Sequence, residues 1–70
     1  MNQDLTPLTM LATCTNGTCP TVFATARGTV LVQGYIVDAA ASGVAVPAGE
    51  TLVEIPRDLL LRAVQAAETS

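Results

Sequence analysis

Two cysteines, Cys14 and Cys19, are the residues of this chain whose type and spacing could do chemistry. They flank Asn16-Gly17, and an Asn-Gly pair between two β-compatible segments is a strong signal for a tight hairpin turn. In such a turn the two cysteines face each other with their Cα atoms about 4.5 Å apart, a separation that a disulfide accepts. A disulfide closing this short loop would stabilise the chain by about 2 kcal/mol.

Two other states of the cysteines are open. In a reducing compartment such as the cytoplasm, thiols usually stay free. A tetrahedral zinc site takes four ligands as a rule, whereas this chain offers two cysteines and no histidine, so a metal site would need two copies. The sequence therefore leaves free thiols, a disulfide, and a shared metal or redox role as alternatives for Cys14 and Cys19.

The other side chains offer little for catalysis. With no histidine, a serine or cysteine nucleophile lacks its usual base, and no glycine-rich phosphate loop is present. Glu50 and Glu54 could share one face of a strand, but general acid catalysis needs a carboxylic acid buried in a cleft, which so short a chain can hardly build. The sequence predicts a protein that is not an enzyme, with no catalytic residues, no cofactor and no metal ligands of its own.

Size and composition point instead to contacts with another polypeptide. The chain has 70 residues, of which 50% are hydrophobic and only 13% are charged. A domain this small buries only about 60% of its unfolded surface and usually needs a disulfide, a metal or a partner subunit. We expect a flexible N-terminal arm over residues 1–7, a single domain over residues 8–70, and a homodimer.

The charge of the chain disfavours nucleic acid and membranes as partners. The formal net charge is −3, with three arginines as the basic residues. Such a chain gains little from phosphates or anionic lipids. The apolar runs are short, and the first four residues lack the basic start of a signal peptide. The sequence therefore predicts a cytoplasmic protein with no nucleic-acid and no membrane partner.

Alternating and helical patterns predict the fold. Gly28 is expected to adopt a positive φ in a turn, and Pro56 is expected to precede a helix over about residues 57–67. The remaining segment, 38–49, is rich in small residues and is expected to be a loop. The expected strands cover residues 9–15, 18–25, 29–37 and 50–55. The predicted fold class is α+β, a three- or four-stranded antiparallel β-meander with one C-terminal α-helix packed on it.

Within that fold, a helix stripe is expected to cover one face of the central strand. The stripe contains Leu60, Ala63 and Val64, and the strand residues expected beneath it are Val30, Val32 and Ile36. The opposite strand face and one leucine on the polar side of the helix remain as a candidate interaction surface. This surface consists of Leu31, Tyr35, Val37 and Leu61. An isolated exposed leucine is common in proteins, so Leu61 could equally be one of these and not a contact residue.

Several short motifs resemble a known group of proteins. Cys19-x-x-Val-Phe, Gly28-Thr-Val-Leu-Val and Leu52-Val-Glu-Ile-Pro56-x-x-Leu-Leu occur in this order. Over about residues 19–64 this order resembles small actinobacterial proteins of a domain-of-unknown-function family, whose genes often lie beside helix-turn-helix regulators of development and antibiotic production. The resemblance implies a regulatory accessory protein, antitoxin-like in one version, that contacts a helix-turn-helix transcription regulator.

A second likeness is confined to one element. Leu52-Val-Glu-Ile-Pro56-Arg-Asp-Leu is similar to the strand-proline-helix element of swapped-hairpin transition-state regulators, which bind DNA as dimers. The basic residues that such proteins use are missing here. The main functional hypothesis is thus a non-enzymatic protein-interaction or regulatory accessory module. The alternatives are a swapped-hairpin-like DNA-binding dimer and a small dithiol redox or metal-linked protein.

Overall fold

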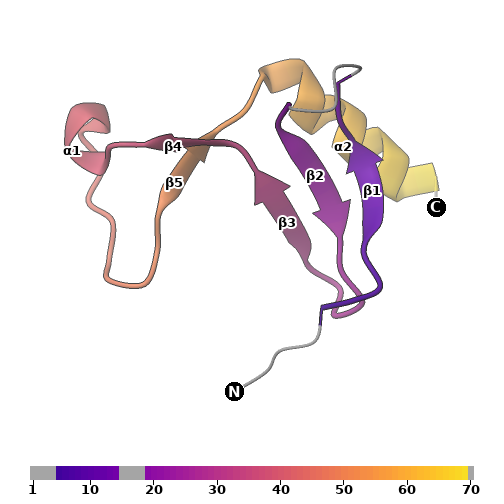
Figure 1. Ribbon diagram of the computed structural model, residues 1–70. Coiled ribbons are helices and arrows are strands. Elements are labelled where there is room, and N and C mark those ends of the chain that lie inside the picture. The colour runs from indigo at the N-terminus through magenta and orange to yellow at the C-terminus, as the bar shows by residue number, and fades with distance from the viewer. Residues whose placement is uncertain (1–4, 15–18, 70) are drawn as a thin grey trace.

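A three-stranded antiparallel sheet, a separate β-hairpin and a C-terminal helix make up the fold (Figure 1). The computed structural model describes residues 5–14 and 19–69. The sheet has the strand order β1-β2-β3, strands β4 and β5 form the hairpin, and α2 packs on β1 and β2. The elements are β1 (Thr9–Ala12), β2 (Thr21–Ala24), β3 (Val30–Gln33), β4 (Tyr35–Val37), α1 (Ala39–Ser42), β5 (Leu52–Glu54) and α2 (Arg57–Thr69). The predicted α+β meander with a packed C-terminal helix is confirmed.

The first hairpin pairs β1 with β2, as the sequence predicts. Met10 lies opposite Phe23, but Ala12 lies opposite Val22, so the register shifts by one residue between Met10 and Ala12. A β-bulge of this kind places one extra residue in one strand and increases the local twist. The expected turn at Asn16-Gly17 lies outside the described residues.

The second turn joins β2 to β3 and contains the expected positive-φ glycine. Gly28 has φ 82°, and the backbone N–H of Thr25 donates to the carbonyl of Thr29 at 2.9 Å. The N–H of Ala26 donates to the carbonyl of Leu5 at 3.2 Å. Leu5, which belongs to the flexible N-terminal segment predicted over residues 1–7, is thereby attached to this turn.

The long strand predicted over residues 29–37 is broken at Gly34 into β3 and β4, so this prediction is wrong. A Cβ atom added at Gly34 would lie 2.8 Å from the backbone oxygen of Glu54 and 2.8 Å from Cγ2 of Ile55. The end of β5 therefore passes directly against the backbone at Gly34. Beyond this point the chain leaves the main sheet and pairs with β5, with Tyr35 opposite Glu54.

A short helix interrupts the segment predicted to be a loop. The carboxylate of Asp38 accepts a hydrogen bond from the N–H of Ala40 at 3.0 Å, and Gly43 ends the helix with φ 76°. An acidic N-cap followed by a left-handed glycine is the usual pair of signals for helix ends. The last strand is shorter than predicted and covers only Leu52–Glu54.

The core lies between α2 and the first two strands. In the part of the chain that the structure describes, the buried cluster consists of Ala12, Val22, Leu59 and Ala63, with the partly buried Leu11 and Ile55 packed against it. Because Ala12 and Ala63 are small, the helix can approach β1 closely. Of the predicted helix stripe, Ala63 is buried in this core, whereas Leu60 and Val64 are exposed and line a groove with Val30 and Val32 instead of covering them. Ile36 lies on β4 and is exposed, so its predicted place under the helix is wrong.

Strands β4 and β5 and helix α1 extend away from the rest of the molecule on the β3 side (Figure 1). We call residues 35–54 the arm, and the main sheet together with α2 the body. The radius of gyration is 13.4 Å, whereas a compact chain of this length has about 11 Å. Among the described residues, no helix has the length and hydropathy needed to cross a membrane.

Candidate functional site

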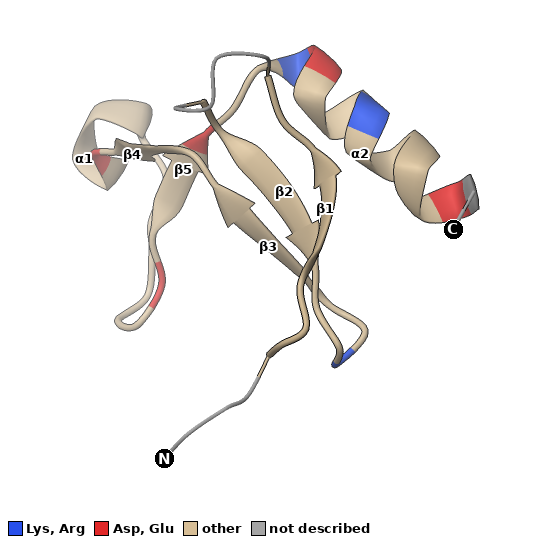
Figure 2. Cartoon of the chain, turned by 45° about the vertical axis from the view of Figure 1, so that its right-hand side comes forward, with Lys and Arg blue, Asp and Glu red and all other residues tan. Residues whose placement is uncertain are grey.

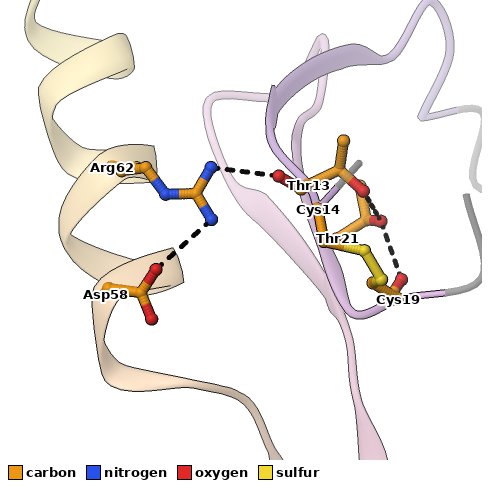
Figure 3. Close-up of a disulfide and its surroundings, with 6 residues drawn as sticks. All are labelled: Thr13, Cys14, Cys19, Thr21, Asp58 and Arg62. Carbon is orange, nitrogen blue, oxygen red and sulfur yellow. Dashed lines mark hydrogen bonds and ion pairs between the residues drawn. A yellow bond between two sulfur atoms is a disulfide. The ribbon is translucent and has the colours of Figure 1, made fainter. Parts of the chain in front are cut away.

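The two cysteines form a disulfide at one end of the β1–β2 pair, with Cys14 after β1 and Cys19 before β2 (Figure 3). Both residues are half-buried and their Cα atoms lie 5.7 Å apart. This separation is inside the range of protein disulfides but longer than the expected 4.5 Å. The bulge in β1 explains the difference, because continuing its shifted register places Cys14 opposite Pro20 instead of Cys19.

Hydrogen bonds connect the residues beside this disulfide (Figure 3). The hydroxyl of Thr21 donates to the carbonyl of Cys19 at 3.1 Å and lies 2.8 Å from the hydroxyl of Thr13. A hydroxyl has one proton, so Thr13 is the donor in the second contact. Thr21 is buried, and these bonds satisfy its side chain.

Helix α2 is attached to the same end of the hairpin through Arg62. Its guanidinium donates to the carbonyl of Thr13 at 3.0 Å and contacts the carboxylate of Asp58 at 3.5 Å. The ion pair is exposed and of the i,i+4 type, which contributes at most about 0.5 kcal/mol. The disulfide, the threonines and Arg62 therefore form a structural link between the hairpin and the helix.

No metal site accompanies the cysteines in the part of the chain that the structure describes. There, no three His, Cys, Asp or Glu side chains gather closely enough to hold an ion. Glu50 and Glu54, considered above as a carboxylate pair, do not share a strand, because β5 begins at Leu52. The N–H of Glu50 instead closes a turn by donating to the carbonyl of Pro47.

An apolar groove runs between α2 and the edge strand β3. Its exposed walls are Val30 and Val32 on the strand and Leu60 and Val64 on the helix. The groove has a volume of about 120 Å³, and all of its lining residues are aliphatic. It exists because α2 covers β1 and β2 but leaves β3 without a helix above it (Figure 2).

No protein-family model, curated protein or solved structure matches this chain.

The four residues predicted as an interaction surface are not brought together. Leu31 lies on the sheet face opposite the groove, beside Phe23. Tyr35 and Val37 belong to the arm, and Leu61 lies on the exposed side of α2. Residues expected to be core, such as Val30 and Val64, instead form the exposed groove. Their apolar periodicity is visible in the sequence, but periodicity alone does not tell a core face from a contact face.

A second, shallow hollow lies where the arm joins the body. Tyr35, Glu54, Ile55 and Pro56 line its volume of about 250 Å³. The hollow is open to solvent, and Glu54 and Tyr35 are its only residues with polar side chains. Ligand sites are usually enclosed clefts with several converging polar groups, so the groove is the better candidate for binding.

Proposed function

We propose that this protein is a non-enzymatic protein-interaction module of the regulatory accessory kind, with the groove and the neighbouring edge of β3 as its contact surface. The observation that carries the proposal is the groove itself, whose walls are aliphatic, half-exposed and free of charge. Exposed apolar patches bordered by polar residues mark protein contact sites. A small domain with so little buried core also gains stability from such a contact.

The partner expected from the resemblance is a helix-turn-helix transcription regulator, and the expected location is the cytoplasm, where such regulators act and where the Cys14–Cys19 disulfide is expected to be reduced most of the time. Both belong to the proposal. The acidic character of the chain, with a net charge of −3, fits a role beside a DNA-binding protein better than a role on the DNA itself.

Capture from source cells tests the proposal. A tagged wild-type chain is expected to retain a helix-turn-helix regulator, identified by mass spectrometry, and Val64→Asp is expected to retain at least tenfold less because it places a charge in the groove. Leu61→Asp is the matched control, since it adds the same charge to the exposed side of the same helix. Equal capture by Val64→Asp and wild type contradicts the groove as contact surface.

A swapped-hairpin-like DNA-binding dimer is the second candidate. It is supported by the strand-proline-helix order of β5, Pro56 and α2. Its weakness is charge, because the three arginines do not form one basic surface: Arg27 precedes Gly28 in the turn, Arg57 begins α2, and Arg62 is bonded to Asp58 and to the carbonyl of Thr13. Figure 2 shows the basic position in the turn far from those on α2. A gel shift at low salt separates the two candidates. A DNA-binding dimer is expected to retard duplex DNA, whereas a protein-interaction module is expected not to.

A further inference from the structure

The outer edge of β3 lacks charged side chains, proline and a bulge, three of the features that normally protect an edge strand. Among the described residues, β3 pairs with β2 on one side and with no strand on the other. Natural edge strands are usually shielded by charged side chains, proline or a bulge. Residues 28–37 contain no charge and no proline, and β3 pairs with β2 without a bulge. This edge is therefore suited to receive another strand.

The direction of the backbone groups on β3 follows from the turn before it. The N–H of Thr25 bonds to the carbonyl of Thr29, which makes these two residues a hydrogen-bonded pair. Backbone groups alternate along an antiparallel ladder, so those of Leu31 point toward β2. The N–H and C=O groups of Val30 and Val32 consequently point to the outer edge.

A second copy of β3 can form hydrogen bonds with the outward N–H and C=O groups of both Val30 and Val32 in one pairing register. If two copies pair antiparallel around a two-fold axis, Val30 of each lies opposite Val32 of the other, and both residues of each pair have their hydrogen-bonding groups on the shared edge. Leu31 then lies opposite its own copy at a pair without hydrogen bonds. This register keeps α2 of both copies on the same face of the joined sheet.

The same arrangement covers the apolar groove. The two-fold axis brings the groove of one copy against that of the other, so that Leu60 and Val64 of both helices lie above the central pair of β3 strands. The arm leaves the body on the β3 side and therefore reaches across the second copy (Figure 1). Ile36 on the arm, which is 84% exposed, acquires a surface that can cover it.

The surface area of the chain agrees with a dimer of this kind. The accessible surface is 5418 Å², whereas a compact monomer of 7.2 kDa exposes about 4,100 Å². The chain therefore exposes about 1,300 Å² more than a compact monomer of its mass, and exposed apolar side chains on the groove and the arm, such as Val30, Leu60 and Ile36, contribute to this surface. A peptide strand added to the edge would cover β3 but would leave the helix side of the groove and the arm exposed.

We propose that two copies of this chain pair edge to edge through β3 and form a continuous six-stranded sheet, with the two grooves closed against each other and Leu31 on the two-fold axis. This inference rests on the proposed function and names its first partner as the chain itself. The groove and the edge of β3 are then the contact surface between the two copies, and a transcription regulator is bound by the assembled dimer, so that Val64→Asp lowers capture by preventing assembly.

Sedimentation and site-specific crosslinking of the full chain test the dimer. The wild type is expected to sediment as a dimer at micromolar concentration. Leu31→Cys is expected to form a disulfide between copies under mild oxidation, because the paired Cα atoms would lie about 4.5 Å apart. Met10→Cys is the control, since Met10 lies on the same sheet face but on the far edge strand. Peptide mapping confirms that the new bond joins position 31 to position 31.

Val30→Pro is the disrupting variant. Proline removes the N–H that points to the outer edge and leaves the bonds to β2 in place, so a folded monomer is expected. A monomeric wild type, or a dimer in which Leu31→Cys crosslinks no better than Met10→Cys, overturns the inference. If the wild type is monomeric but captures a regulator, and Val64→Asp captures less of it, the proposed function holds and the dimer inference fails. If the wild type is monomeric and Val64→Asp captures as much regulator as the wild type, the dimer inference and the proposed contact surface both fail.

Discussion

Cys14 and Cys19 are the residues whose chemical state most affects the hairpin. Their disulfide closes a six-residue loop, and the loss of such a constraint from the unfolded chain costs about 2 kcal/mol of stability. Reduction is therefore expected to lower the free energy of unfolding by about that amount, measured as the urea midpoint with and without reductant. Replacing both cysteines by serine should give the reduced midpoint under both conditions. Equal midpoints for the oxidised and reduced wild type would contradict a stabilising disulfide.

Gly34 explains why one prediction from the sequence is wrong. The alternation of residues 29–37 is continuous, and a strand with apolar residues on both faces is the natural reading. At this break the carbonyl of Glu54 lies 2.8 Å from where a Cβ on residue 34 would be, so only glycine fits there. Such an approach depends on a residue 20 positions away, so local pattern cannot reveal it. Gly28, by contrast, was predictable, because its turn is local.

Helix α2 depends on Leu59 more than on its neighbours. Leu59 is 2% exposed and packs in the core, whereas Leu61, two positions later, is 58% exposed. Leu59→Ala is expected to destabilise the protein by about 2–4 kcal/mol through lost burial and a residual cavity. Leu61→Ala should change stability by less than about 0.5 kcal/mol. Thermal or urea unfolding followed by circular dichroism measures both, and similar losses for the two variants would mean that α2 packs through a different face.

The start of α2 and its apolar stripe were predictable, because Pro56 and the spacing of the leucines and alanines are local signals. The rotation of the helix over the sheet was not. Leu59 and Leu60 differ little in sequence terms, and only the structure shows that Leu59 packs with Ala12 while Arg62 bonds to Thr13. Helix α1 was missed because its four residues are specified by the two caps at Asp38 and Gly43.

The whole molecule combines a small core with a large exposed apolar surface. Composition alone predicted this imbalance, since half of the residues are hydrophobic in a chain of 70. The sequence did not reveal where the surplus lies, because the groove appears only once α2 is placed over β1 and β2. The candidate contact surface is thus a property of how elements pack, whereas the disulfide is a property of spacing along the chain.

The stability of the whole molecule is expected to depend on its concentration. If folding and association are coupled, a tenfold rise in concentration adds about 1.4 kcal/mol to the free energy of unfolding per dimer. With a typical urea dependence for proteins of this size, the midpoint rises by roughly 0.5–1 M. Urea unfolding at two concentrations measures this shift, and Val30→Pro, as the monomeric control, should show none. A wild-type midpoint that stays constant would mean that the four-residue core and the disulfide stabilise the fold without a second copy.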